Sequence, residues 1–413
     1  MGVGARPLGL VAGSEGSVTV RIFGFDLLPY PEHLDHLKVD GELPYPLARK
    51  HFRPEIAVHT YREHLDAWAL MEQVGFDGVG FNEHHTSPYG LMTSPNIMAA
   101  AASQRLSRMK ILIYGNLLPI HEPLRLAEEL AMLDCLTGGR MISGVARGIP
   151  REYKAYNVNL AESRARFEEA WEIIKLAWSE EVFSYEGKYW SYRDVAIWPR
   201  PVQQPGPPVW VPVTTSQETM EWAAKENAPI TPGAVGTLAA RQDMVRYYAA
   251  CLARQGRAIT PDHVVTPASV YVADSREQAL KEAGPYMLYF FHTLFSHGNL
   301  FNVGGQRQSG YVREEGLGWL RPENREEFLR ALQGFRRMTA EDLTRNERLC
   351  WGSPAQVRDK LIGLAEALGS NTLLVQFNQG AMPHAMFVRQ IQRFATEVMP
   401  DLCRHNVTQA LAA

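Results

Sequence analysis

Apolar runs and amphipathic segments alternate along most of this chain. The apolar runs are short and bounded by turn residues, which is typical of buried strands, and the segments between them have helical spacing. The predicted strands are Val18–Leu28, Val79–Phe81, Ile111–Tyr114, Met141–Val145, Val209–Val213 and Thr372–Phe377. The predicted helices are Thr60–Val74, Asn96–Leu106, Pro123–Leu136, Arg164–Trp178, Gln217–Glu226, Pro354–Leu368 and His384–Val398, and Val182–Tyr192 is predicted to be a hairpin.

Repeated strand–helix units predict an α/β protein with a parallel sheet covered by helices. We count about eight units, the number that closes a (β/α)8 barrel. The rival is an open, doubly wound sheet, which usually carries a glycine fingerprint after its first strand. Here the first strand runs into Leu27-Leu28-Pro29, with no GxGxxG. We therefore predict one barrel domain over residues 18–402, between tails at 1–17 and 403–413.

Residues Pro285–Leu320 interrupt the alternation. The segment is long, rich in aromatic residues and dotted with glycine. Long loops within compact domains are usually lids or binding loops, so we expect a lid or insertion here. The alternative is an arm that packs against the barrel or against a second copy of the chain.

Composition narrows the classes of function. The chain has 413 residues and a net charge of −3, and it has no basic block, which argues against nucleic acid as a partner. Its four cysteines lie far apart and form no CxxC, so we expect a reducing, cytoplasmic setting. No apolar stretch reaches the length of a membrane span.

Glu83-His84-His85 directly follows a predicted strand. In a barrel of parallel strands, this end of a strand faces the reaction site. Histidine is well suited to proton transfer near neutral pH, so His84 and Glu83 are candidate catalytic residues. A metal site is the alternative, but neighbouring strand residues point to opposite faces, and we predict none. The histidines could also be purely structural.

Two further segments are suited to binding an anion. Arg147 follows a strand next to Gly148, and its planar guanidinium suits a phosphate, although an ordinary salt bridge would explain it equally well. Thr215 and Glu218 fit a capping box, and a helix start attracts phosphate. Most capping boxes, however, only cap helices.

At the end of another strand, Tyr114-Gly115-Asn116 could let a flat ring approach the backbone, or it could be a simple turn.

Several motifs in sequence order resemble those of the bacterial luciferase-like, flavin-dependent monooxygenase family, over roughly Val20 to Pro400. They are Glu83-His84-His85, Leu118–Arg125, Gly144–Gly148, Glu221–Ala224, Trp351–Pro354 and Gly380–His384. The resemblance implies a (β/α)8 barrel that binds FMN as FMNH2 and reacts with O2. It implies that a C4a-peroxyflavin then oxygenates a small organic substrate. The aromatic lid favours an apolar or aromatic substrate. A separate NAD(P)H:flavin reductase and a homodimer are also expected.

The resemblance also assigns roles to residues. His84 is implied to be catalytic and Arg147 to grip the FMN phosphate. The loop after the fifth strand would add contacts through Thr215, Ser216 and Thr219. A cis peptide facing the ring is implied at Tyr114-Gly115, with Asn116 beside it. Barrels in general bind phosphate after strands seven and eight, and the resemblance moves the site to strands four and five.

Two positions depart from the luciferase pattern. Ala146 stands where luciferase has a cysteine, which implies a differently shaped pocket beside the ring. Thr215 stands where luciferase has a glutamate, which removes a negative charge and should favour phosphate.

Other functions remain compatible with these motifs. A deazaflavin (F420)-dependent oxidoreductase would transfer hydride without O2. A non-catalytic flavin-binding subunit would bind the cofactor without turnover, and a metal-dependent hydrolase is a more distant alternative.

Overall fold

The computed structural model describes residues 19–233, 237–297, 317–334, 337–346, 348–407 and 411. The predicted N-terminal tail, residues 1–17, lies outside this part of the chain. The predicted C-terminal tail begins in ordered contact, because Asn406 forms an antiparallel bridge with Thr19 and Val407 is buried. The last residues of the barrel domain therefore extend to at least residue 407.

The centre of the molecule is a nine-stranded parallel sheet in the order β10-β9-β11-β1-β2-β3-β4-β7-β8. A parallel bridge between Ile230 of β8 and Val264, next to β9, joins the two ends. Eight strands therefore close into the predicted (β/α)8 barrel. The ninth strand, β10, pairs with the carboxyl-terminal half of β9. The strands are β1 (Arg21–Asp26), β2 (Gly78–Phe81), β3 (Lys110–Leu117), β4 (Met141–Ala146), β7 (Val209–Val213), β8 (Ile230–Pro232), β9 (Val265–Val272), β10 (Leu349–Gly352) and β11 (Thr372–Gln376).

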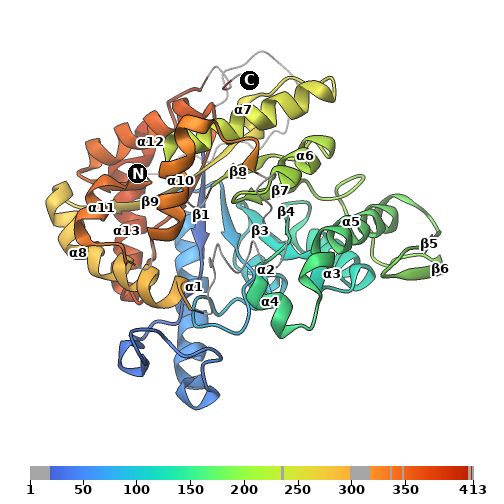
Figure 1. Cartoon of the computed structure of the whole chain (residues 1–413), viewed down its shortest axis with the longest axis horizontal. Coiled ribbons are helices and arrows are strands. Elements are labelled where there is room, and N and C mark those ends of the chain that lie inside the picture. Colours follow the sequence, from blue (N-terminus) through green and yellow to red (C-terminus); the bar gives the residue numbers. More distant parts are fainter. Residues whose placement is uncertain are drawn as a thin grey trace.

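Helices surround the strands, and the hairpin of β5 (Phe183–Glu186) and β6 (Ser191–Val195) projects beside α5, as the sequence predicts (Figure 1). The helices are α1 (Pro54–Val74), α2 (Pro95–Ser103), α3 (Pro123–Thr137), α4 (Pro150–Ala155), α5 (Ser163–Ser179), α6 (Gln217–Lys225), α7 (Leu238–Arg254), α8 (Arg276–Tyr289), α10 (Pro322–Gly334), α11 (Ala340–Arg345), α12 (Pro354–Leu368), α13 (His384–Glu397) and α14 (Met399–Leu402). Among the described helices, none is long and apolar enough to cross a membrane.

A separate apolar cluster fills the inside of the barrel. Its buried members come one from each of six strands: Phe23, Leu112, Ile142, Trp210, Val265 and Leu374. Phe25 and Tyr114 pack on top of this cluster, with ring centroids 5.5 Å apart. Side-chain layers of this kind make a barrel interior solid rather than hollow. Any cavity must therefore lie above Phe25 and Tyr114, at the carboxyl ends of the strands.

β3 and β4 approach each other unusually closely near the middle of this layer. A Cβ atom on Gly144 would lie 2.0 Å from the carbonyl oxygen of Ile113. A Cβ on Gly115 would lie 2.6 Å from the carbonyl carbon of Gly144. Only glycine fits at both positions, and the register of β3 against β4 shifts between Ile113 and Asn116. The Tyr114–Gly115 peptide is cis, which confirms the expectation from the family resemblance.

The segment predicted to be a lid begins as helix rather than loop. Helix α8 continues through Pro285 to Tyr289, and a π-helical turn, η6, covers Phe290–Phe295. The prediction of a loop over these residues is therefore wrong. Glycine and proline interrupt the sequence pattern, but tertiary packing of the aromatic side chains overrides this local preference. Residues 298–316 of the predicted lid lie outside the described residues.

Candidate active site

A cavity of about 290 Å3 opens at the carboxyl ends of the barrel strands. Its volume lies near the lower end of the range for small-molecule sites. Most of the residues singled out from sequence line it: Glu83, His84, Tyr114, Gly115, Arg147, Thr215, Ser216 and Thr219. Asn116 does not line the cavity. It is fully buried beneath the site, where its amide donates to Glu83 Oε2 at 3.2 Å and to Asn96 Oδ1 at 3.1 Å. A direct contact of Asn116 with a cofactor is therefore excluded by its position.

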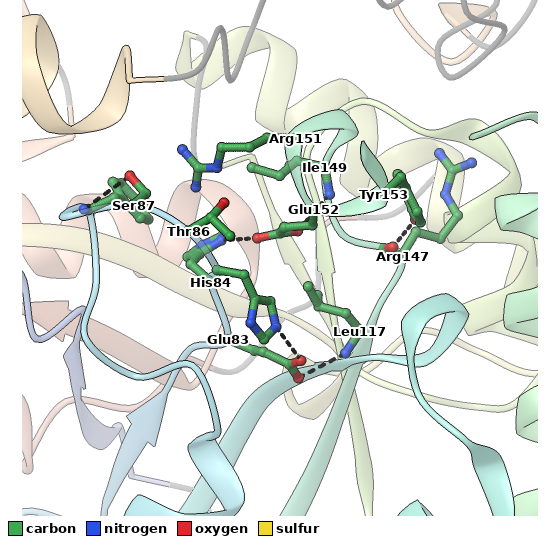
Figure 2. Close-up of polar contacts among 12 residues, drawn as sticks. Glu83, His84, Thr86, Ser87, Leu117, Arg147, Ile149, Arg151, Glu152 and Tyr153 are labelled. Atoms are coloured by element: carbon green, nitrogen blue, oxygen red, sulfur yellow. Dashed lines mark hydrogen bonds and ion pairs between the residues drawn. The ribbon is translucent and has the colours of Figure 1, made fainter. Parts of the chain in front are cut away.

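Glu83 is the centre of a hydrogen-bond network at the end of β2. His85 Nε2 lies 2.9 Å from its carboxylate and His121 Nε2 lies 2.8 Å from it. The backbone N–H of Leu117 donates to the same carboxylate at 3.1 Å, as Figure 2 shows. Burial alone would raise the pKa of Glu83, but the hydrogen bonds from His121 and His85 outweigh it and lower the pKa to about 2.

This network gives Glu83 a different role from the catalytic one first considered. A carboxylate with a pKa near 2 and every lone-pair direction engaged is a poor proton carrier at neutral pH. It instead fixes the end of β2 to β3 and to the imidazoles of His85 and His121. We therefore treat Glu83 as a residue that positions the site.

His84, the next residue, points the other way and lines the cavity. Its Nδ1 lies 2.9 Å from Glu152 Oε1, as the dashed line in Figure 2 shows. Because a carboxylate accepts, this contact makes Nδ1 the protonated nitrogen and leaves Nε2 without a hydrogen bond to any described residue. The His84 side chain is 19% exposed, while that of Glu152 is fully buried. His84 and Glu152 thus form a dyad with one imidazole nitrogen available to a ligand.

Glu152 was not identified from sequence. It lies in the first turn of α4, and its Oε2 also accepts from the backbone N–H of Ile149 at 2.9 Å. Pro150 followed by an acid two residues later is a typical helix start, which was the available signal. Nothing local shows that the same carboxylate also reaches His84, 68 residues away.

The fourth and fifth barrel strands, β4 and β7, are paired, and their loops meet at another part of the rim. Arg147, after β4, lines the cavity, as do Ser216 and Thr219 at the start of α6. Ser216, not Thr215, is the N-cap of α6: its Oγ accepts from the backbone N–H of Thr219 at 3.2 Å. The predicted capping box was therefore wrong by one residue, although the helix start was correctly located.

Arg164 does not line the cavity itself, but it holds two side chains that do, and it forms ion pairs with Glu168 and Glu218. Its Nη2 donates to Thr219 Oγ1 at 2.8 Å and to Ser216 Oγ at 3.3 Å. Arg164 lies in the first turn of α5, where the helix dipole disfavours a positive charge. An arginine at the predicted start of a helix could therefore have been singled out from the sequence as a candidate functional residue. Arg147 and the N-terminus of α6, whose Ser216 and Thr219 hydroxyls are held by Arg164, together form an end of the cavity suited to a phosphate.

Aromatic side chains form the wall near His84. The rings of His84 and Tyr89 make an edge contact with centroids 4.7 Å apart. Tyr89 in turn packs against Phe290 at 5.6 Å and Phe295 at 6.0 Å. Phe291 contacts both phenylalanines. We call Tyr89, Phe290, Phe291 and Phe295 the aromatic wall.

Hydrogen bonds hold the wall in place at the end of η6. His297 Nδ1 lies 2.9 Å from Ser87 Oγ, and His297 Nε2 lies 2.9 Å from the Pro44 carbonyl oxygen. The Arg151 guanidinium donates to the His297 carbonyl at 2.6 Å. These contacts tie η6 to the loop after β2 and to α4. The same two segments carry His84 and Glu152, so the aromatic wall and the dyad are held by the same elements.

One polar side chain on the cavity lining has unused hydrogen-bonding capacity. The amide oxygen and nitrogen of Asn82 are buried and have no partner among the described residues. Buried polar groups normally find a partner, so these atoms fit a ligand with donors and acceptors on its edge. A flat heteroaromatic ring with a phosphate tail, such as FMN, satisfies both this lining and the cationic end.

Comparison with protein families gives a match over most of the chain. The family model described as luciferase-like monooxygenase matches residues 45–371. Among curated relatives, uncharacterized protein y4wF of Sinorhizobium fredii is 32% identical over 48% of this chain and 54% of its own length. The oxygenase component of flavin-dependent trigonelline monooxygenase from Acinetobacter baylyi is 25% identical over 84% of this chain and 91% of its own length. The match thus spans about half of the first relative and most of the second.

Solved structures share the fold at low sequence identity. The oxygenating constituent of 3,6-diketocamphane monooxygenase from Pseudomonas putida, solved with FMN, superposes with a TM-score of 0.66 at 19% identity, covering 92% of this chain and 98% of its own. The coenzyme F420 dependent tetrahydromethanopterin reductase of Methanopyrus kandleri superposes with a TM-score of 0.62 at 17% identity, covering 94% of this chain and all of its own.

Proposed function

This chain belongs to the luciferase-like monooxygenase family, and from that premise we propose that it is the oxygenase component of a two-component monooxygenase. It would use FMNH2 and O2 to oxygenate a small apolar or aromatic substrate, with FMNH2 supplied by a separate NAD(P)H:flavin reductase. The Acinetobacter relative is an oxygenase component, which supports the two-component arrangement. The FMN bound to the Pseudomonas protein of the same fold supports the choice of flavin.

Named residues would hold the cofactor at its two ends. Arg147, with Ser216 and Thr219, would bind the phosphate, and Thr215 lies beside them on the cavity lining. Asn82 would satisfy the polar edge of the ring, next to the cis peptide at Tyr114–Gly115. Reduced flavin supplies the electrons that activate O2, and the protein supplies orientation and a dry environment.

His84 would then be the catalytic proton carrier. Its Nε2 is the imidazole nitrogen available at the cavity, because Glu152 engages Nδ1. Glu152 orients the ring and stabilises the imidazolium that forms when Nε2 takes up a proton. The aromatic wall beside His84 excludes water from that proton transfer.

One observation carries this proposal: a single cavity is lined by Arg147 and the start of α6 and also by His84, an imidazole that the Glu152 carboxylate orients. Two weaker proposals accompany it. We expect a homodimer, because closed symmetric pairs are the commonest oligomers, and a cytoplasmic location, because the four dispersed cysteines form no CxxC.

Titration of FMN against wild type and Arg147→Ala tests the cofactor site. We expect the variant to bind FMN more weakly by about 1.5–3 kcal/mol, the scale of a lost charged hydrogen bond. The matched control is Arg125→Gln on the surface of α3, where the arginine side chain is 71% exposed. Equal affinity in Arg147→Ala and wild type would refute the phosphate assignment.

Oxygen uptake with FMNH2 tests the reaction class. A coupled reductase would supply FMNH2, and mass spectrometry would detect addition of one oxygen atom to compounds of an aromatic panel. Hydride exchange with F420, without O2, would instead support the reductase alternative. Tight FMN binding with no turnover across the panel would favour a non-catalytic flavin-binding subunit.

A further inference from the structure

Arg348 lines the same cavity on a different part of its rim. It immediately precedes β10, and its carbonyl oxygen accepts from the backbone N–H of Ser269 on β9. In the closed strand order, β7 and β8 separate β9 from β4, whose loop carries Arg147. Arg348 therefore belongs to another end of the cavity than the proposed phosphate site.

The charge of Arg348 lacks compensation within the described residues. Its Nε is buried without a hydrogen-bond partner, and no described carboxylate forms an ion pair with it. Burial, reinforced by the like charge of buried Arg241, lowers the pKa of Arg348 to about 10. Glu83 is the one acidic residue among the described residues of the lining, and its carboxylate is already engaged by His85 and His121. A largely enclosed cation with no partner among the described residues is costly, and an anion from outside would relieve that cost.

The surroundings of Arg348 define what else the anion must carry. Tyr89, a member of the aromatic wall, lines the same cavity as Arg348. The same Tyr89 ring contacts His84 at 4.7 Å. A guanidinium, an aromatic surface and the proposed catalytic imidazole thus line the same cavity, and the aromatic surface contacts the imidazole.

We propose that Arg348 binds the carboxylate of a substrate whose flat apolar body lies against the aromatic wall beside His84. The planar fork of an arginine accommodates both oxygens of a carboxylate, which would fix the substrate in one orientation. This inference rests on the proposed function, and it narrows the substrate class from small aromatic compounds to aromatic carboxylic acids.

Calorimetric titration of the FMN-loaded protein with benzoate and with benzamide tests the inference, since the two differ chiefly in charge. We expect wild type to bind benzoate at least about tenfold more tightly than benzamide, the scale of one charged hydrogen bond. Arg348→Met should abolish that preference while leaving FMN affinity unchanged. Arg348→Lys should keep part of it, and the surface control Arg125→Gln should keep all of it.

Thermal melting gives an independent measurement that does not need turnover. Because Met replaces an uncompensated, largely enclosed charge with an apolar chain of similar length, Arg348→Met should melt at or above the temperature of wild type. Benzoate should raise the melting temperature of wild type and not that of the variant. A variant that melts well below wild type would show that the protein itself pairs the charge, which would overturn the inference.

Other outcomes separate this inference from the proposed function. If wild type binds benzoate and benzamide equally, Arg348 does not bind a substrate carboxylate. If Arg348→Met binds FMN more weakly, Arg348 belongs to the cofactor site instead. If wild type binds no FMN but the ligand-free protein still prefers benzoate, the flavin proposal fails while the carboxylate site stands.

Discussion

Glu83 and His84, two adjacent residues in the segment after β2, have side chains that point in opposite directions. Glu83 faces down into a closed network with His85 and His121, while His84 faces the cavity and meets Glu152. The alternation of side chains along an extended segment explains why one neighbour can anchor the loop while the other is free for the role of proton carrier that we propose. It also explains why the two histidines of the motif do not share one ligand.

The His84–Glu152 dyad leads to a prediction about turnover. We expect His84→Ala to retain FMN binding and to lose product formation by at least about a hundredfold, the lower range for a general acid or base. Glu152→Gln should lower the rate less, because the amide oxygen can still accept from Nδ1 but carries no charge. It should also move the pH dependence of the rate, which a purely structural role would not do. An unchanged product rate in His84→Ala would remove His84 from the mechanism.

At the scale of elements, helix starts bring the polar groups of the site together. The first turn of α4 supplies Glu152, the N-cap of α6 supplies Ser216, and the first turn of α5 supplies Arg164. α4 and α6 follow the loops at the carboxyl ends of β4 and β7, so their unpaired N–H groups face the cavity side, whereas α5 follows α4 and reaches the site through Ser216 and Thr219. The close approach of β3 and β4 at Gly144 fixes the position of Tyr114 between these elements.

Ser216→Ala tests whether the cap of α6 also serves a ligand. Loss of the cap should cost about 1 kcal/mol of stability, and loss of the hydroxyl near Arg164 should weaken FMN binding. The matched control is Ser275→Ala, since Ser275 caps α8 in the same way at 3.1 Å but lies outside the cavity. Urea unfolding should show similar losses for both variants, with reduced FMN affinity in Ser216→Ala alone. Similar FMN affinities would restrict Ser216 to a structural role.

At the scale of the whole molecule, the barrel is solid at one end and reactive at the other. The inner cluster that includes Phe23 and Trp210 fills the lower part of the barrel and carries the floor of the cavity. Above it, Glu83 joins β2 to β3 and to the loop bearing His121. This ionic network connects the stability of the barrel to the geometry of the site.

The network predicts how stability depends on pH. The pKa of Glu83 is lowered from 4.5 to about 2, so its contribution is present above pH 4.5 and is lost as the pH falls toward 2. Burial lowers the pKa of His121, but the contact with Glu83 outweighs this and raises it overall, so the contribution of His121 is lost as the pH rises above 6.5. We therefore expect this pair to contribute most between about pH 4.5 and 6.5.

Glu83→Gln tests this pH dependence. The variant should lose stability on the order of 3 kcal/mol near pH 6 and should show a flatter acid limb in urea unfolding measured from pH 2 to 7. The control is Glu326→Gln on α10, whose side chain is 87% exposed. An acid limb as steep in Glu83→Gln as in wild type would contradict this assignment.

The sequence by itself determined the barrel, the location of the strand ends and the residues that stand there. Periodicities of two and 3.6 are local properties, so strands such as Val209–Val213 and helices such as Pro354–Leu368 could be located from their own residues. The same local pattern placed His84 and Arg147 at the reacting face. The prediction from local sequence placed the cap of α6 at Thr215 instead of Ser216. It also treated the start of the aromatic segment, which is helical, as a loop.

The tertiary structure alone decided which side chains meet. Glu152 reaches His84 across 68 residues of sequence, and Arg348 reaches the same cavity from the segment before β10. Closure of the barrel brings segments that are distant in the sequence next to one another. Burial then determines which polar groups lose water and need a partner within the protein or a ligand. The spacing of residues in the sequence reveals neither the spatial neighbours of a side chain nor its burial. A charge without a counter-ion or an amide without a hydrogen bond can be recognised only once the surrounding elements have packed.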